Sequence, residues 1–245
     1  MITFFKTIIY IPLYNILVLL LNVRWIDAGV ATVILTVLVK IILYPLAKKA
    51  TITQTRMKEK EGELSLLKEK YKNKEEQAVK IMEFYKTNNI NPFSSILTII
   101  IQIPIILSLY YIFLKAGLPV INTSLLYPFI KAPAVVSMNF LGLMDISKKS
   151  IILALLAAVA SFLQMHFASR TTNQTQPSLK AAAGKEDFSQ VLNRQMKYTM
   201  PLIVFFIAWK ISGVVALYWF VSNLVGIAQD AYTRRHMAKT SLAAK

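Results

Sequence analysis

The chain has 245 residues, of which 56% are hydrophobic and only 16% are charged, and its mean hydropathy is +0.51. Soluble domains carry about 25% charged residues, so this composition excludes an ordinary soluble protein and indicates one embedded in lipid. Cysteine is absent, which excludes disulfides and thiolate metal sites, and two histidines are too few for a dedicated metal centre. The net charge of +16 is better explained by basic loops and anionic lipid than by nucleic acid, since no RNA-binding aromatic motif occurs.

The N-terminal segment, residues 1–27, is apolar but is interrupted by Pro12 and Asn15 and closed by Asp27. We expect it to form a helix in the membrane interface, with a spanning helix over Thr3–Leu21 as the alternative. The sequence has no Arg-rich transit peptide and no clear cleavage site behind its first apolar stretch. These features predict a multi-pass protein of the bacterial plasma (inner) membrane.

Five further stretches are long or nearly long enough to cross a bilayer, which takes about 20 apolar residues. Ser212 and Gly213 separate the last two stretches and predict a tight turn. The predicted fold is therefore an all-α membrane protein, a five-transmembrane-helix bundle with a cytoplasmic helical hairpin and an N-terminal interfacial helix. Its expected parts are a first core span (28–47), the cytoplasmic hairpin (48–92), a second span (93–114), an extracytoplasmic loop (115–150), a third span (151–168), a cytoplasmic loop (169–198), the fourth and fifth spans as a hairpin (199–231) and a basic cytoplasmic tail (232–245).

The orientation follows from the basic residues outside the spans, which concentrate on the cytoplasmic side of bacterial membrane proteins. If the five spans alternate, 20 Lys and Arg residues fall on one side and seven on the other. The more basic side includes the tail, so we expect the C-terminus in the cytoplasm.

The region 48–92 is polar and rich in Lys and Glu, and its apolar residues recur at helical spacing. This periodicity predicts two short amphipathic helices joined near Lys72–Lys74, and it says nothing of their role. The residues expected on the apolar faces of the hairpin are Met57, Leu64, Leu67, Tyr71, Ile81, Met82 and Tyr85.

Lys40 is the most informative residue, because it lies within the first span. A lysine at the centre of a spanning helix costs about 2.5–3.5 kcal/mol on the insertion scale, so such residues usually face water or a partner. Lys40 lies about 12 Å along the helix from Lys48, so a side chain that extends to the cytoplasmic surface is the alternative. Since Asp230 follows the last span, we expect no buried ion pair.

Polar residues in four of the five spans could solvate an inward-facing Lys40. Each alone is more often an interhelical hydrogen bond, but together they could form a wet, positively charged groove that lowers the desolvation cost of a crossing polypeptide. The candidate groove residues are Lys40, Thr36, Gln102, Ser108, Gln164, Tyr218, Ser222 and Asn223.

Enzymatic functions find no support in the residue inventory. No G-x-S-x-G elbow, Walker-type loop or intramembrane carboxylate is present, so we expect no catalytic residue, no cofactor and no nucleotide hydrolysis. Three functions remain: an insertase, a chaperone or scaffold that assists folding beside the Sec translocon, and a passive channel for small solutes.

Several stretches carry a resemblance to the YidC/Oxa family of membrane protein insertases. They are LVKIILYPL (Leu38 to Leu46), FYKTNNINPF (Phe84 to Phe93), IQIPIILSLYYIF (Ile101 to Phe113), FLGLMDIS (Phe140 to Ser147) and LYWFVSNLVGIAQ (Leu217 to Gln229). The resemblance implies five core spans, a hydrophilic groove open to the cytoplasm and lipid, and nascent membrane proteins with short translocated tails as substrates. The ribosome and the Sec translocon are candidate partners, with no specific nucleic-acid site beyond ribosomal contact.

The sequence departs from the family pattern in three respects. The basic residue in the groove is usually Arg, whereas this chain has Lys40, which keeps the charge but lacks a planar, bidentate fork. The chain is also expected to be a minimal core, without the large extracytoplasmic domain or the lipoprotein signal of other members. Its short basic tail weakens the expectation of strong ribosome binding.

Overall fold

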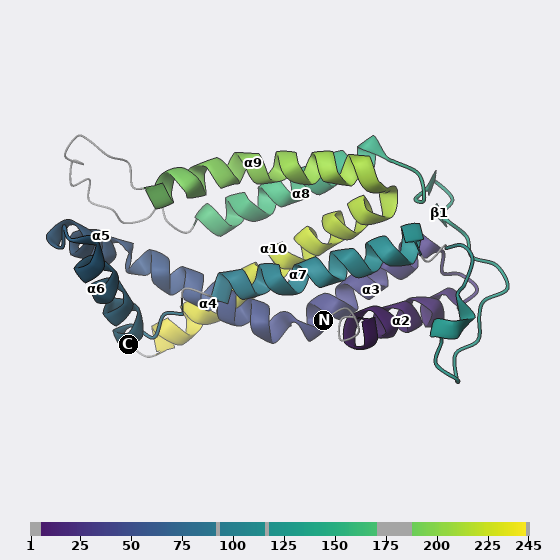
Figure 1. Cartoon of the computed structure of the whole chain (residues 1–245), viewed down its shortest axis with the longest axis horizontal. Helices are drawn as coiled ribbons and strands as arrows, with labels where there is room; N and C mark the ends of the chain where they lie inside the picture. The colour runs from purple at the N-terminus through teal and green to yellow at the C-terminus, as the bar shows by residue number, and fades with distance from the viewer. Residues whose placement is uncertain (1–5, 92–93, 116–117, 171–187, 244–245) are drawn as a thin grey trace.

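The computed structural model describes residues 6–91, 94–115, 118–170 and 188–243, and most of these residues are helical. Its membrane-type helices form one elongated bundle (Figure 1). The elements in chain order are η1 (Lys6–Tyr10), α2 (Ile11–Leu21), α3 (Ala28–Ile42), α4 (Tyr44–Glu59), α5 (Glu61–Lys70), α6 (Lys74–Thr87), α7 (Ser94–Tyr110), η2 (Tyr111–Lys115), η3 (Thr123–Leu125), β1 (Asn139–Phe140), β2 (Met144–Asp145), α8 (Ile151–Arg170), α9 (Phe188–Ile211) and α10 (Gly213–Ala243).

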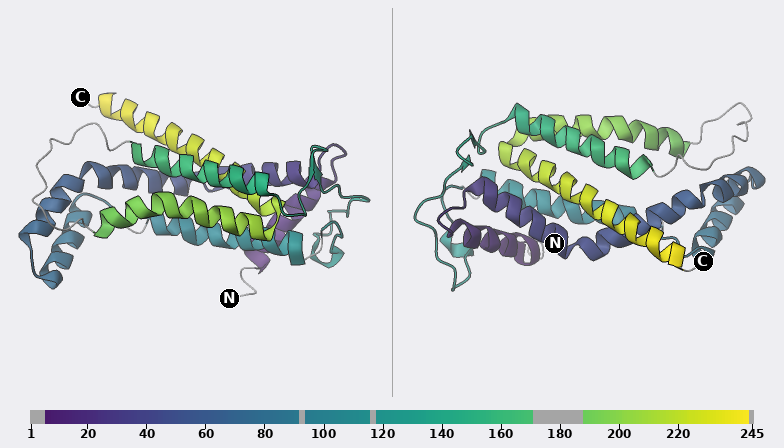
Figure 2. Two further views of the ribbon diagram at one scale, coloured as in Figure 1. Left: turned by 90° about the horizontal axis from the view of Figure 1, so that it is seen from above. Right: turned by 180° about the vertical axis from the view of Figure 1, so that it is seen from behind.

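Helix α10 is the central element of the bundle. It packs against α8 on one side and against α3 and α4 on the other, while α8 also packs against α9. Figures 1 and 2 show α10 crossing the bundle obliquely, with α5 and α6 at one end and the β1–β2 hairpin at the other. The largest fully buried side chains include Tyr14, Tyr218 and Ile112, so the apolar core joins α2, η2 and α10.

The outer faces of the helices are apolar, as lipid contact requires. Leu155 of α8 and Phe206 of α9 are 57% and 54% exposed. Among the described residues, two helices have the length and composition to cross a membrane, Ile151–Ala168 and Gly213–Lys239, and a third candidate is the bent pair Ala28–Ile42 and Tyr44–Met57. The architecture is that of an all-α membrane protein.

The first core span, expected as one helix over 28–47, is bent by 61° at Leu43. Pro45 lies in the first turn of α4, where a missing N–H costs little, and a proline there disfavours continuation of the preceding helix. Helix α4 then runs without a break to Glu59, past the expected start of the cytoplasmic hairpin. At the other end, Asp27 caps α3 by accepting from the N–H groups of Gly29 (2.7 Å) and Val30 (2.9 Å).

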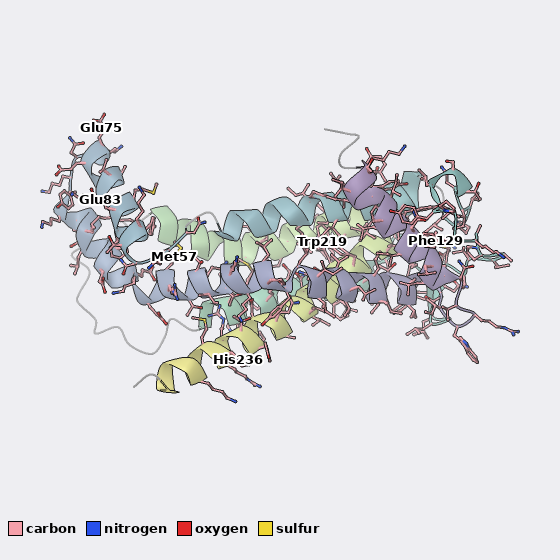
Figure 3. The ribbon with its side chains drawn as sticks, turned by 90° about the horizontal axis from the view of Figure 1, so that it is seen from below. Met57, Glu75, Glu83, Phe129, Trp219 and His236 are labelled. Carbon is pink, nitrogen blue, oxygen red and sulfur yellow. The ribbon has the colours of Figure 1, made fainter. Side chains whose placement is uncertain are left out.

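Helices α5 and α6 pack against each other and project from the bundle; Glu75 and Glu83 mark this end in Figure 3, opposite Phe129. Asn73 caps α6, and Gln77 Nε2 ties the connection by donating to the carbonyls of Lys68 (2.7 Å) and Tyr71 (2.8 Å). No residue of α5 or α6 is buried. Of the residues expected on apolar faces, Met82 is exposed and the others are partly buried: Met57 on α4, Leu64 and Leu67 on α5, Tyr71 in the connection, and Ile81 and Tyr85 on α6.

The charges of α6 lie on its solvated surface. Lys80 Nζ lies 2.9 Å from Glu83 Oε2, and this hydrogen bond and ion pair raise the pKa of Lys80. A pair as exposed as this contributes little to stability, because water screens it and two long side chains must be ordered. The stability of the α5–α6 hairpin therefore depends on the connection between its two helices and on its contact with α4 rather than on its charges.

The N-terminal helix α2 is held by the loop that follows η2. Asn15, one of the residues that interrupt the apolar pattern, donates to the Leu125 carbonyl (2.8 Å) and accepts from the Tyr127 N–H (2.7 Å). The Tyr14 hydroxyl accepts from the Asn122 N–H at 2.8 Å. Asn15 and Tyr14 are fully buried, so these bonds replace water at groups that would be costly to leave unpaired.

The connection between α9 and α10 is a single residue, Ser212, and the loop that precedes α8 holds it in place. The N–H groups of Gly213 and Val214 donate to the carbonyls of Lys148 (2.7 Å) and Ile146 (3.0 Å). A Cβ on Gly213 would lie only 3.0–3.1 Å from this backbone, so glycine permits the close approach. Helix α9 begins at Phe188, within the expected loop 169–198, and α10 continues into the expected tail; residues 171–187 lie outside the described part.

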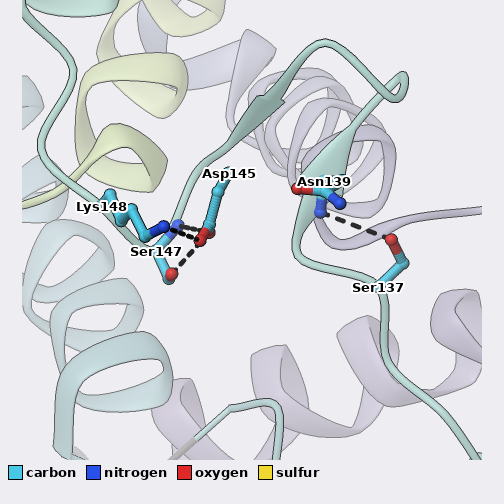
Figure 4. A network of polar contacts seen from close by, with 5 residues as sticks. All are labelled: Ser137, Asn139, Asp145, Ser147 and Lys148. Carbon is cyan, nitrogen blue, oxygen red and sulfur yellow. Dashed lines mark hydrogen bonds and ion pairs between the residues drawn. The ribbon is translucent and has the colours of Figure 1, made fainter.

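Asp145 organises the loop beside this turn (Figure 4). Its carboxylate accepts from the Ser147 hydroxyl (2.5 Å) and N–H (3.0 Å), and Lys148 Nζ lies 3.4 Å away. The Ser147 hydrogen bonds, followed by Lys148, hold the pKa of Asp145 below its ordinary value. The ionised carboxylate is thus favoured in the folded protein.

A group whose pKa is lower in the folded protein than in the unfolded chain stabilises the fold at a pH above its unfolded pKa. That contribution to stability is lost as the pH falls through the folded pKa. The difference in melting temperature between the wild type and Asp145→Asn should therefore be present at pH 7 and shrink below about pH 4. Thermal unfolding in detergent at both pH values measures this difference in melting temperature. The other carboxylates are common to both proteins, so their contributions cancel. A difference independent of pH would show that the carboxylate charge contributes nothing.

Candidate intramembrane polar site

Three of the polar residues expected in a groove, Tyr218, Ser222 and Asn223, lie on one helix, α10. Tyr218, Ser222, Asn223 and Asp230 follow one another along this helix over about 18 Å. Tyr218 contacts α7, Asn223 contacts α8 and Asp230 contacts α4, while Gln229 contacts α3.

At the upper end, the Tyr218 hydroxyl connects α7 with α10. Gln102 Nε2 donates to it, and the Ser222 side chain hydrogen-bonds to the same hydroxyl. Tyr218 and Ser222 are each only 2% exposed, whereas Gln102 is partly buried. The ring of Tyr218 packs in the core, while its hydroxyl has two hydrogen-bond partners, Gln102 and Ser222.

In the middle of the site, α8 approaches α10 closely. Asn223 Nδ2 donates to the Ala157 carbonyl at 3.4 Å. The Gln164 amide lies directly over Gly226, where a Cβ would collide with its Nε2. Gln164 and Asn223 are partly buried, so both reach the edge of the helix contact rather than its centre.

Two of the expected groove residues use their hydroxyl protons within their own helices. Thr36 Oγ1 donates to the Thr32 carbonyl (2.6 Å), and Ser108 Oγ donates to the Pro104 carbonyl (2.8 Å). Both are buried. The structure therefore joins Gln102, Tyr218 and Ser222 by hydrogen bonds but does not tie Thr36 or Ser108 to that group.

Lys40 lies in the last turn of α3, three residues before the bend at Leu43, and is partly buried. A cation is favourable there because the last turn of a helix carries partial negative charge. The Lys40 carbonyl accepts from Gln229 Nε2 of α10 at 2.8 Å, which satisfies one of the last carbonyls of α3. Asp230, the next residue, lies close enough to Lys40 for an electrostatic attraction.

Below Lys40, three polar contacts join α4 to α10. Thr51 Oγ1 donates to Asp230 Oδ1 (2.5 Å), the hydroxyls of Tyr44 and Thr233 are 3.3 Å apart, and Arg234 Nη1 lies 3.3 Å from Thr55 Oγ1. None of these residues was among the expected groove residues, because Thr51 and Thr55 fall in the expected hairpin and Thr233 and Arg234 in the expected tail, while Asp230 was placed just past the last span. The sequence carries one sign of these contacts. Thr51 and Thr55 are four residues apart, as are Asp230 and Arg234, which places each pair on one face of its helix.

A family model described as "60Kd inner membrane protein" matches residues 20–240, which include every element of this site. The chain belongs to the 60Kd inner membrane protein family. Relatives named "Membrane protein insertase YidC" include those of Clostridium tetani (27% identical over 87% of this chain and 84% of the relative) and Clostridium perfringens (30% over 86% and 81%). The relative of Francisella tularensis subsp. novicida is 29% identical over 98% of this chain but only 37% of its own length.

These comparisons confirm the resemblance to the YidC/Oxa insertases that the sequence motifs indicated. In this member of the 60Kd inner membrane protein family, a lysine rather than an arginine lies at position 40. An ammonium attracts a carboxylate without requiring the planar geometry of a guanidinium. The charge of the site is thus kept, while a two-pronged clamp on a carboxylate is not available.

Proposed function

We propose that the protein is a membrane protein insertase and chaperone. It moves short hydrophilic segments of nascent membrane proteins through a positively charged intramembrane groove and releases their spans into lipid without nucleotide hydrolysis. The observation that carries the proposal is the partly buried Lys40, placed where polar side chains of α7, α8 and α10 line the same bundle. The names of the relatives agree with this activity.

The physical advantage of such a site is a lower desolvation cost. A polar or acidic segment loses its hydration when it enters hydrocarbon, and partly buried amides, hydroxyls and one cation replace part of that hydration. The apolar span of the same substrate gains free energy by entering lipid, which supplies the driving force. A nucleotide site is therefore not needed.

The topology that we propose has five spans, formed by α3 with the start of α4, and by α7, α8, α9 and α10. Helix α2 lies in the extracytoplasmic interface, α5 and α6 form the cytoplasmic hairpin, and the C-terminus is cytoplasmic. The support is the distribution of basic residues, 20 on the proposed cytoplasmic side against seven on the other. Contacts of the cytoplasmic side with the ribosome and of the bundle with the Sec translocon belong to the same proposal.

Photo-crosslinking tests the proposal directly. A photoreactive residue at Gln102 or Gln164 should crosslink to a nascent single-span protein, because both are polar positions at the edge of the site. The matched control is Leu155, which lies on α8 with Gln164 but faces outward and is 57% exposed. Equal crosslinking at Gln164 and Leu155 would contradict a defined substrate path.

Reconstitution separates the insertase from the other two functions. The purified protein in liposomes should insert a small single-span protein without other components. A chaperone or scaffold would speed folding without changing the insertion yield, and a passive channel would conduct solute without any nascent chain.

A further inference from the structure

Lys40 and Asp230 lie close enough for an electrostatic attraction. Asp230 is the only acidic residue among residues 188–245, and no acidic residue lies within α3, α7 or α8. The contact between Gln229 and the Lys40 carbonyl brings this part of α10 against the end of α3. The one carboxylate of α10 thus follows directly on a residue that contacts the end of α3, where Lys40 lies.

The position of Asp230 is fixed by the neighbouring helix. Thr51 is buried, and its hydroxyl donates to Asp230 Oδ1 at 2.5 Å, so α4 holds the carboxylate beside the bend. Arg234 follows one turn later and contacts Thr55, which holds this second cation against the next turn of α4. The hydrogen bond from Thr51 thus holds the carboxylate in place beside the bend.

An anchored carboxylate changes what Lys40 can do. A charge that is partly removed from water is costly without a partner, and two opposite charges attract more strongly where the effective dielectric constant is low. Lys40 is therefore partly neutralised before a substrate arrives. An acidic substrate segment has to compete with Asp230 for the ammonium, whereas a neutral segment does not.

We propose that Asp230 is a specificity-determining positioning residue, whose carboxylate, anchored by Thr51, acts as the internal competitor of acidic substrate segments for Lys40. The proposal rests on the insertase function proposed above. The attraction of the site for an acidic segment then depends on two opposite charges, Lys40 on α3 and Asp230 on α10. Loss of the carboxylate should strengthen the attraction for acidic segments alone.

The first test uses no substrate. Lys40→Gln, Asp230→Asn and the double variant form a thermodynamic cycle on thermal stability in detergent. Each single variant should lower the melting temperature, and the double variant should be more stable than the sum of the two losses, because neither charge is left alone. Additive losses would overturn the proposed pairing, whatever the protein transports.

The second test measures substrate charge preference. Two single-span probes differ only in a translocated tail that carries either two Asp or two Asn residues, and crosslinking at Gln102 is compared between them. In Asp230→Asn the ratio of acidic to neutral crosslinking should rise about threefold to tenfold. Asp230→Glu should restore the wild-type ratio, and Lys40→Gln combined with Asp230→Asn should abolish the rise.

Thr51→Val removes the hydrogen bond but keeps the carboxylate. It should lower the melting temperature and raise the ratio less than Asp230→Asn does, because the carboxylate remains but its anchor is lost. An equal change for both tails in Asp230→Asn, or an unchanged ratio, would overturn the proposal. If the wild type crosslinks neither probe, the insertase function itself fails, and the stability cycle still decides whether the two charges are paired.

Discussion

Replacing Lys40 by leucine should reduce the insertion of a single-span protein with an acidic translocated tail about fivefold to tenfold, equivalent to about 1–1.4 kcal/mol. Leucine removes the one cation of α3, so the acidic tail loses the charge that offsets its desolvation. Lys40→Arg should retain insertion, since the charge remains. Protection of the translocated tail from protease in proteoliposomes measures the yield.

The control variant for this prediction is Lys210→Leu, which removes a basic residue from the exposed end of α9 and should leave insertion unchanged. A neutral tail should be insensitive to the change at Lys40. Because Lys40→Leu leaves Asp230 without its counter-charge, the melting temperature of each variant is measured in parallel. Equal insertion by the wild type, Lys40→Arg and Lys40→Leu would remove Lys40 from the mechanism.

Gly29→Ala should destabilise the protein by about 1–3 kcal/mol, the cost of overpacking a close contact. A Cβ on Gly29 would lie within 2.7 Å of Phe140 Cβ, so the β1–β2 hairpin would have to move away from the start of α3. That movement would also strain the bond from the Leu141 N–H to Asp27 Oδ2, now 2.9 Å. The melting temperature in detergent should fall clearly.

The matched variant for this prediction is Gly62→Ala. A Cβ on Gly62 meets no atom within 4 Å, and the residue lies within the exposed helix α5. Alanine is a better helix former than glycine by up to about 1 kcal/mol, so this variant should be neutral or slightly stabilising. If both variants behaved alike, the contact between Gly29 and Phe140 would not matter for stability.

Local sequence patterns predicted much of the helical content. The long apolar stretches correspond to α8 and α10, and the spacing of Leu64, Leu67, Ile81 and Tyr85 predicted helices where α5 and α6 occur. The unusual position of Lys40 singled it out without any coordinates, because a lysine between Val39 and Ile41 is costly in lipid wherever the neighbours lie. The family motifs added the expected function.

What the sequence by itself determined is the set of apolar helices, the polar hairpin and the presence of one intramembrane cation, because each depends on neighbours within a few turns. The tertiary structure decided the bend at Leu43 and the partners of the polar groups. Gln229 reaches Lys40 across 189 residues, and Asp230 reaches Thr51 across 179. No local period encodes such contacts, since they arise only when α3, α4 and α10 pack together, and that packing brings a carboxylate expected beyond the last span beside the lysine.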